Sequence, residues 1–423
     1  MTLHDPVSDQ ATAPRHRDKP MRGVFVLPEV PWPVSGGREI YSHHLLRAFL
    51  DAGHEATIVL AAPPDAERLN AWPLRGRLRV VPLDTRADAA PPPPFGGVDR
   101  RWRRYFGWND HALADLRDNI ARQAPAFVAG AGLAMLPALR AAPASAPRLW
   151  FALDEPALYQ RSLAAAAPAW RERARRLGLA AAFALYQRAY AAHVDAAVAV
   201  STRDARELAR VGGFHTVLNM PNGVDADYFR PGDEPVQPRT AVFWGRLDFP
   251  PNIDAVSWFV DKAWPLVRAA EPDARLRIVG RNPGQPIRAA VEGAAGVELV
   301  GPVDDLRAEA RRAAVVVLPM RSGAGIKNKL LEAAALARPI VASPLAVDGL
   351  DAGNAWRIAR TPRQWADQLN DAWARPDLAA DMGERARRWV RTTHRWALNV
   401  DRLVDFIADR PAPARRQPRR RAA

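Results

Sequence analysis

Cysteine is absent from the 423 residues of this chain. The chain therefore cannot form disulfides, offer a thiolate nucleophile or hold zinc or an iron–sulfur cluster through cysteine. Long uncharged apolar runs are also missing, and the first twenty residues are polar without the apolar stretch of a secretion signal. From these absences we expect a cytoplasmic protein.

Lysine is scarce, with 4 lysines against 56 arginines. The net charge is +14, and it falls to +8 without residues 410–423, which hold six arginines and no acidic residue. This tail and residues 1–20 are predicted to be disordered, because their composition cannot bury enough apolar area. A solvated end is the favoured interpretation of the tail, and an arm for an anionic membrane is the alternative. Because no nucleic-acid motif is present, we expect no nucleic-acid partner.

Short β-rich runs alternate with helical stretches from residue 22 onward. This alternation predicts parallel strands with crossover helices, and it restarts after a polar, proline-rich segment at 231–239. We predict an α/β protein with two facing, doubly wound, Rossmann-like domains, 21–232 and 238–395, and a helix at 396–409. Ligands bind at the carboxyl ends of such strands, so the site is expected between the domains. The predicted strands are 23–27, 56–60, 78–83, 148–153, 196–200 and 216–220, then 241–244, 276–279, 297–300, 315–319 and 339–342.

Residues 91–110 combine four consecutive prolines with interleaved arginine and aromatic residues. One interpretation is a loop and amphipathic helix that contacts a lipid-linked acceptor or the membrane interface. The favoured one is a surface helix whose aromatic residues pack on the first sheet while its arginines face water.

Residues 315–343 carry the strongest chemical signal: a buried-type strand, a glycine turn, a helix and another strand. The free N–H groups at a helix start attract phosphate, and Gly323 and Gly325 would let the chain approach it closely. Lys327 and Lys329 stand at this helix start, where cations are unfavourable unless an anion binds. Cations there would also stabilise the charge that grows on a diphosphate leaving group.

Glu332 lies three residues after Lys329 and shares a helix face with it. Its carboxylate could meet hydroxyl groups beside the phosphates, or it could form only an ion pair with Lys329. Both interpretations stay open.

Four segments carry a family resemblance: SGGR at 35–38, MPNGVDADYFRP at 220–231, FWGRLDFPPN at 243–252 and GAGIKNKLLEAAALARPIVAS at 323–343. Together they resemble glycosyltransferase family 4, the retaining group 1 glycosyl transferases of the GT-B fold. The resemblance extends from Arg22 to about Asp409. It implies an enzyme that moves a sugar from a nucleotide-diphosphate sugar to a saccharide or lipid-linked acceptor, in exopolysaccharide or cell-envelope synthesis.

The resemblance implies that Glu332 contacts the nucleotide ribose as the second glutamate of the family's E-x7-E motif. Ala324 occupies the position of the first glutamate, which resembles a variant with a glycine-rich turn and a basic pair. The carboxylate that would hold the donor sugar is therefore missing.

The resemblance also implies that Arg246 binds the donor diphosphate, and a salt bridge at a sheet edge is the alternative. The family often has a lysine near residue 251, so Lys327 and Lys329 are expected to supply that charge. Gly36 and Gly37 would form the other wall of the phosphate site, although such a pair is often only a turn.

Asp154 and Glu155 follow the predicted strand 148–153 and precede Pro156. Either carboxylate could orient or deprotonate an acceptor hydroxyl. Alternatively, one of them caps the next helix, as a proline at the first turn favours.

Asp225 and Asp227 spell a D-x-D pattern, which holds a divalent cation in another glycosyltransferase fold. Here the pair lies in a turn-rich run near the linker, and cationic side chains can replace a metal. We expect neither a metal nor another cofactor. The alternatives to a transferase are a nucleotide-sugar epimerase or hydrolase, for which no acid/base pair is evident, and a basic binding protein. Peripheral contact with the inner face of an anionic membrane is a further expectation.

Overall fold

The computed structural model describes residues 19–34, 36–62, 64–83, 102–103, 105–167 and 169–410. Ser35, nearly all of the predicted N-terminal tail, residues 91–101 of the aromatic segment and most of the C-terminal tail lie outside these residues. Within the described parts, no helix combines the length and the apolar composition needed to cross a bilayer.

The first domain is built on a seven-stranded parallel sheet with the order β3-β2-β1-β4-β5-β6-β7. Most of its central strands are buried on both faces, as expected for parallel strands covered by helices. The strands are β1 (Arg22–Leu27), β2 (Glu55–Leu60), β3 (Arg79–Pro82), β4 (Phe127–Ala131), β5 (Arg148–Leu153), β6 (Ala196–Ala199) and β7 (Val217–Asn219). The helices are α1 (Gly37–Asp51), α2 (Ala66–Ala71), α4 (Asp110–Gln123), α5 (Leu136–Ala141), α6 (Pro156–Ala166), α7 (Trp170–Ala191) and α8 (Thr202–Glu207).

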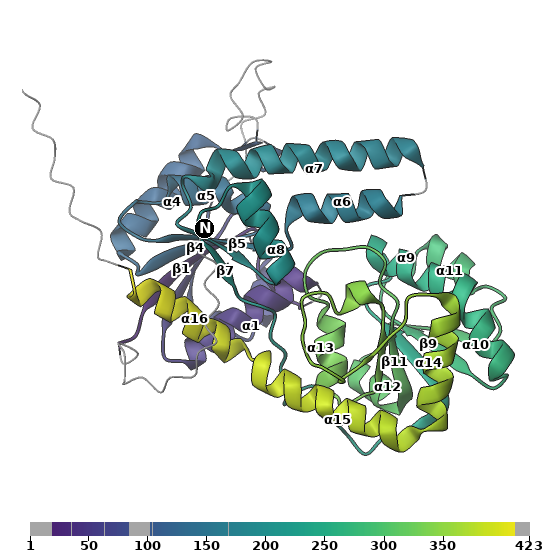
Figure 1. Ribbon diagram of the computed structural model, residues 1–423. Helices are drawn as coiled ribbons and strands as arrows, with labels where there is room; N and C mark the ends of the chain where they lie inside the picture. The colour runs from purple at the N-terminus through teal and green to yellow at the C-terminus, as the bar shows by residue number, and fades with distance from the viewer. Residues whose placement is uncertain are drawn as a thin grey trace, which may run out of the picture.

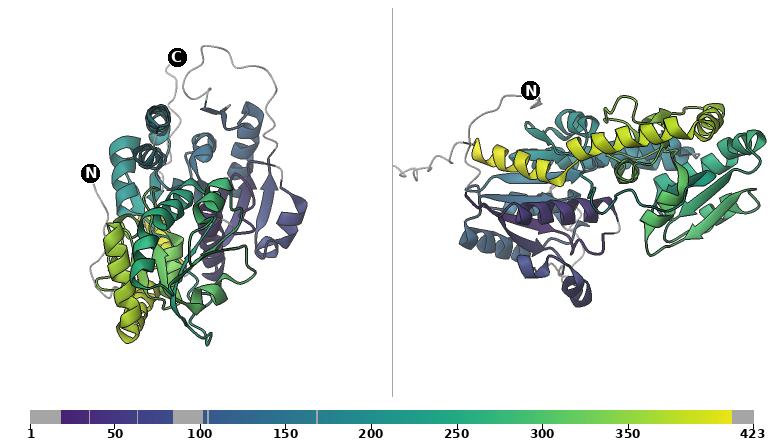
Figure 2. Two further views of the ribbon diagram at one scale, coloured as in Figure 1. Left: turned by 90° about the vertical axis from the view of Figure 1, so that its right-hand side faces the viewer. Right: turned by 90° about the horizontal axis from the view of Figure 1, so that it is seen from below.

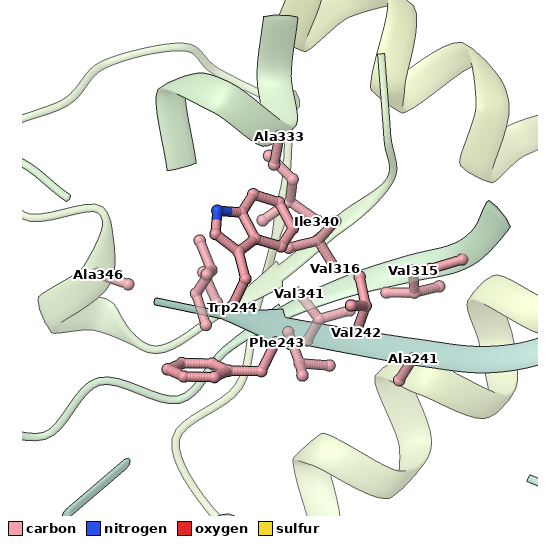
Figure 3. Close-up of a cluster of buried hydrophobic side chains, with 14 of the residues drawn as sticks. Ala241, Val242, Phe243, Trp244, Val315, Val316, Ala333, Ile340, Val341 and Ala346 are labelled. Atoms are coloured by element: carbon pink, nitrogen blue, oxygen red, sulfur yellow. The ribbon is translucent and has the colours of Figure 1, made fainter. Parts of the chain in front are cut away.

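The second domain contains a six-stranded parallel sheet with the order β10-β9-β8-β11-β12-β13. Figure 3 shows part of its core, where Trp244 lies among apolar side chains of the sheet and Ala333 of the helix at Asn328–Ala335. The strands are β8 (Gln237–Trp244), β9 (Arg275–Val279), β10 (Val297–Gly301), β11 (Ala313–Leu318), β12 (Ile340–Ala342) and β13 (Arg357–Ile358). The helices are α9 (Pro250–Trp258), α10 (Trp264–Ala270), α11 (Gln285–Val291), α12 (Leu306–Arg312), α13 (Asn328–Ala335), α14 (Pro362–Ala374) and α15 (Pro376–Thr393).

Two parallel sheets with covering helices confirm the predicted α/β class. The sequence prediction missed β4 and β13, and β8 begins inside the predicted linker. β4 escaped notice because Phe127–Ala131 holds small residues, including Gly130, at which a Cβ would approach Met135 to 2.9 Å. Close packing of α5 on this strand thus requires glycine and removes the usual β-branched signal.

The last helix, α16 (Trp396–Ala408), crosses from the second domain to the first. Figures 1 and 2 show α15 and α16 running in succession along both domains. Trp396 and Val400 pack with Tyr41 of α1 in the first domain's core. The chain passes between the domains twice, near Val224 and near His394. These two crossings lie side by side, because the Val224 N–H donates to the His394 carbonyl at 2.8 Å.

Candidate functional site

The candidate site lies where β8 and β11 end, opposite α1 and the start of α6 in the first domain. Asn328, at the start of α13, hydrogen-bonds Asn222 near the domain crossing. A Cβ placed on Gly37 at the start of α1 would lie 4.0 Å from the Asn328 amide nitrogen. The N-termini of α1 and α13 therefore face each other, and both present free N–H groups to the cleft.

The turn before α13 is in direct contact with the first domain. The Gly323 N–H donates to the Ser162 hydroxyl of α6 at 3.0 Å. Gly325 has a φ of +66°, and a Cβ there would lie 1.8 Å from an Asp154 carboxylate oxygen. A larger residue at 325 would meet both a conformational penalty and a clash, so glycine is required.

Lys327 stabilises this turn from within. Its ammonium group donates to the carbonyls of Ala324 at 2.6 Å and Gly325 at 2.8 Å. Burial lowers the pKa of Lys327, whereas the charges of Asp154 and Asp204 raise it. The Lys327 side chain, which the sequence predicted to bind phosphate, thus contacts the backbone of its own turn.

Lys329 has a different environment at the start of the same helix. Its Nζ donates to Oδ1 of Asn252 at 2.7 Å and lies 4.1 Å from the centre of the Phe243 ring. Burial lowers the pKa of Lys329 to about 7, although the charge of Glu332 acts in the opposite direction. A group with this pKa takes up a proton readily when an anion binds nearby.

Glu332 forms a hydrogen bond with a tryptophan. The indole N–H of Trp244 donates to Oε2 of Glu332 at 2.7 Å, which leaves Oε1 without a hydrogen bond among the described residues. Burial raises the pKa of Glu332, whereas Trp244 and Lys329 lower it. The charges of Lys329 and Glu332 therefore influence each other, but their hydrogen bonds have other partners. Lys329 donates to Asn252, and Glu332 accepts from Trp244.

Arg246 lies at the same strand end and forms two hydrogen bonds with Asp248, at 3.0 and 3.3 Å. The ion pair that the sequence left open as an alternative is thus present, and the Arg246 side chain remains about half exposed. A Cβ on Gly36 would lie 3.8 Å from Nη1 of Arg246 and 2.6 Å from Oε2 of Glu39. Gly36 and Arg246 therefore face each other across the cleft.

Asn252 connects the cationic residues, and the sequence interpretation assigned it no role. Its amide nitrogen donates to the Arg246 carbonyl at 2.7 Å while its oxygen accepts from Lys329. The sequence could have indicated a role for Asn252, because this residue lies in the segment FWGRLDFPPN just after the end of β8. Trp244 and Asp248, in the same segment, were missed as well.

Asp154 and Glu155 have separate surroundings. Glu155 is fully buried as the N-cap of α6, where it accepts from the N–H groups of Ala157 and Leu158 and from Gln187. The capping interpretation fits this residue, because its carboxylate oxygens are engaged within the first domain.

The Asp154 carboxyl lies instead against the glycine turn of the second domain. Desolvation of the carboxyl raises its pKa to about 7, although the charge of Lys327 lowers it. The residue as a whole keeps access to solvent. Asp154 is therefore the carboxyl of the predicted pair that can meet a molecule in the cleft.

Asp225 closes a local turn by accepting from the N–H groups of Asp227 and Tyr228, and it also pairs with Arg47. This is the behaviour of an aspartate that caps a turn.

A groove of about 1360 Å³ runs between the tip of the α6–α7 pair and helices α9 to α11. It adjoins the glycine turn at Ser322 and is lined by Arg176 and Trp258, among others. Neither Lys329 nor Arg246 lines it, so the groove lies beside the cationic site.

Residues 238–375 match the model of a family described as glycosyl transferases group 1. A search among curated proteins finds no match for the chain. These 138 residues make up most of the second domain and contain Arg246, Lys327, Lys329 and Glu332.

Several solved structures resemble the whole chain. Sucrose-phosphate synthase from Thermosynechococcus elongatus is 16% identical, with a TM-score of 0.68 over 91% of this chain and 98% of the other. Anabaena HepE in complex with UDP and glucose is 13% identical, with a TM-score of 0.63 over 92% and 99%. An S. aureus TarM mutant in complex with fondaparinux, alpha-GlcNAc-glycerol and UDP is 11% identical, with a TM-score of 0.66 over 92% and 99%.

These likenesses confirm the predicted GT-B fold. The family match in the second domain, together with this fold, supports a glycosyltransferase function.

Proposed function

We propose that the protein is a retaining glycosyltransferase that moves a sugar from a nucleotide-diphosphate sugar to a saccharide or lipid-linked acceptor. Its reaction would serve exopolysaccharide or cell-envelope synthesis and would need no metal. The observation that carries the proposal is the juxtaposition of Arg246, Lys329 and Glu332 opposite the glycine pair at the start of α1.

The donor diphosphate would lie between the two facing helix N-termini. Arg246 and Lys329 would bind its oxygens, and both would stabilise the negative charge that grows as the bond to the sugar breaks. Glu332, held at Oε2 by Trp244, would accept from ribose hydroxyls through Oε1. In this arrangement cationic side chains and backbone N–H groups take the part that a divalent cation has elsewhere.

Asp154 would orient the acceptor hydroxyl or accept its proton. Its carboxyl lies in the cleft beside Gly325 and has a pKa of about 7, which suits a group that exchanges protons near neutral pH. The groove beside Ser322 would admit the acceptor.

The ligands of the structural relatives support this choice of substrates. HepE has been solved with UDP-glucose, and TarM has been solved with UDP, alpha-GlcNAc-glycerol and fondaparinux. Those complexes pair a uridine nucleotide with a sugar or a saccharide, the two classes that the proposed reaction requires.

Thermal unfolding with UDP, GDP, ADP or dTDP in the presence of a chelator tests the donor site. A nucleotide that binds only the folded protein raises the midpoint, so we expect one of the four to stabilise the wild type. Lys329→Gln removes a charge-assisted contact and should weaken the binding of that nucleotide at least about tenfold. Lys262→Gln is the matched control for nucleotide binding, because Lys262 pairs with Asp261 at the groove and lies outside the cationic site.

Equal binding by the wild type and Lys329→Gln would show that the diphosphate binds elsewhere. Stabilisation only after a divalent cation is added would overturn the metal-independent part of the proposal. Analysis of the products formed from the matching nucleotide sugar, with and without saccharide acceptors, then distinguishes transfer from hydrolysis.

A further inference from the structure

The long helix α7 has an outward face that plays no part in the cleft. Figure 1 shows α6 and α7 as an antiparallel pair that reaches from the first domain alongside part of the second, with α7 on the outside. The two helices pack against each other, so α6 covers the inner side of α7. The opposite side of α7 faces away from both domains.

This side is apolar although it is exposed. Trp170, Leu177 and Leu185 are 75%, 46% and 63% exposed. They lie seven and eight residues apart, so they share one helix face, and only Ala174, Gly178 and Ala181 stand between them on it. Below, "outer face" means these six residues.

Three of the eight large apolar side chains exposed among the described residues lie on the outer face. A concentration of this kind marks an interaction surface.

Arginines border the outer face. α7 contains five of them and a single acid, Glu172, which pairs with Arg175 and Arg176. Arg171 lies over the Trp170 ring, with its guanidinium carbon 5.6 Å from the centre of the ring. Neither Arg171 nor Arg173 has an acidic partner among the described residues, so both are available to anions outside the protein.

We propose that the outer face of α7 docks on a lipid bilayer that contains anionic lipids. Its tryptophan and leucines would enter the boundary between headgroups and acyl chains, and its flanking arginines would bind lipid phosphates. A second copy of the chain fits less well, because a symmetric contact would oppose two sets of arginines.

Docking here would hold the cleft close to the headgroups. The α6–α7 pair begins two residues after Asp154 and carries Ser162, which contacts the glycine turn. An acceptor anchored in the same bilayer would then be confined near the groove. The docking surface is separate from the donor site, so the inference does not rest on the proposed function.

Vesicle flotation with the full chain tests the proposal. We expect binding to phosphatidylcholine vesicles that contain phosphatidylglycerol, weaker binding to phosphatidylcholine alone, and a loss of binding as salt rises. Trp170→Gln/Leu185→Gln should lower the apparent affinity at least about tenfold, because each apolar side chain contributes by burial. Leu378→Gln, at a leucine of α15 that is 54% exposed, should leave it unchanged.

The absence of native cysteine allows a direct measurement of insertion. A polarity-sensitive dye on Leu177→Cys should shift to the blue with anionic vesicles, and the same dye on Leu378→Cys should not. Both substitutions replace exposed side chains, so the variants should fold, and an unchanged thermal midpoint verifies this. Both variants should also keep nucleotide binding.

Three outcomes would overturn the proposal. Unchanged binding of Trp170→Gln/Leu185→Gln would assign membrane contact to another part of the chain, such as the arginine-rich tail. A dye at 177 that shifts only as protein concentration rises would indicate self-association. If the wild type binds no vesicles, the outer face would instead be a surface for a protein partner.

Discussion

At the scale of single residues, two lysines two positions apart have different roles. Lys327 donates to the carbonyls of its own turn, whereas Lys329 donates to a side chain from another element. The difference follows from their positions, because Lys327 precedes the first turn of α13 and Lys329 lies within it. Only Lys329 is placed to exchange its present partner for a ligand without undoing the glycine turn.

The pKa of Lys329 predicts a pH-dependent donor site. Its pKa is about 7 in the folded protein and about 10.5 when exposed, so the amine is mostly neutral above pH 7. A bound diphosphate favours the ammonium form, so binding should take up a proton, and affinity should fall as pH rises from about 7.5 to 9.5. Calorimetry in buffers of different ionisation enthalpy measures this uptake.

Lys329→Gln should bind more weakly and lose this proton uptake. Lys262→Gln should retain it. Proton uptake that persists in Lys329→Gln would assign the titration to another group. In the absence of ligand, burial of Lys329 costs stability at neutral pH, and this cost should decline as pH rises toward 10.5, where the unfolded chain loses the same proton.

At the scale of elements, the strand ends that frame the site depend on two glycines. Gly245 follows β8 and Gly280 follows β9, and a Cβ on Gly280 would lie 1.8 Å from the Gly245 carbonyl oxygen. The two loops can approach this closely only without side chains. Their contact positions Arg246, the residue after Gly245, at the cleft.

Gly280→Ala should destabilise the protein by at least about 2 kcal/mol, because the clash is with backbone that cannot move aside. Urea unfolding followed by circular dichroism measures this change. Gly178→Ala is the matched control in exposed helix α7, where no atom lies within 4 Å of the added methyl group. It should stabilise the protein by about 0.5–1 kcal/mol, and a similar loss in both variants would contradict the argument.

At the scale of the whole molecule, α16 joins the domains. Trp396 packs on Tyr41 and His44 of α1, and a Cβ on Gly223 in the first crossing would lie 2.7 Å from the Trp396 nitrogen. Asn399 reinforces the junction by donating to the Pro221 carbonyl at 2.6 Å. Both crossings are thereby held against the first domain, and a closure of the cleft would hinge there.

Trp396→Ala should cost about 3–5 kcal/mol and should separate the unfolding of the two domains. Differential scanning calorimetry would then show a broadened or divided transition. Trp396→Phe keeps the ring contacts, and the indole N–H has no hydrogen-bond partner among the described residues. Trp396→Phe should therefore lose much less free energy of unfolding than Trp396→Ala. An equal loss in both variants would mean that ring packing does not cause the destabilisation.

Strand positions and the glycosyltransferase motifs were readable from the sequence because they depend on local patterns. Apolar runs and turn residues predicted most strands of both sheets. The two-residue strand β13 was missed, and β4 was missed because close helix packing there demands glycine. The segment 323–343 identified the cationic turn for the same reason, since its glycines, lysines and glutamate are neighbours in the chain.

Which of those neighbours face the cleft was decided by contacts between segments far apart in sequence. Asn252 orients Lys329, Trp244 holds Glu332, and the Gly325 backbone lies against Asp154. Glu155, adjacent to Asp154, is buried as a cap. Such roles arise because packing assigns each polar group the nearest partner in space, and sequence patterns carry no record of that distance.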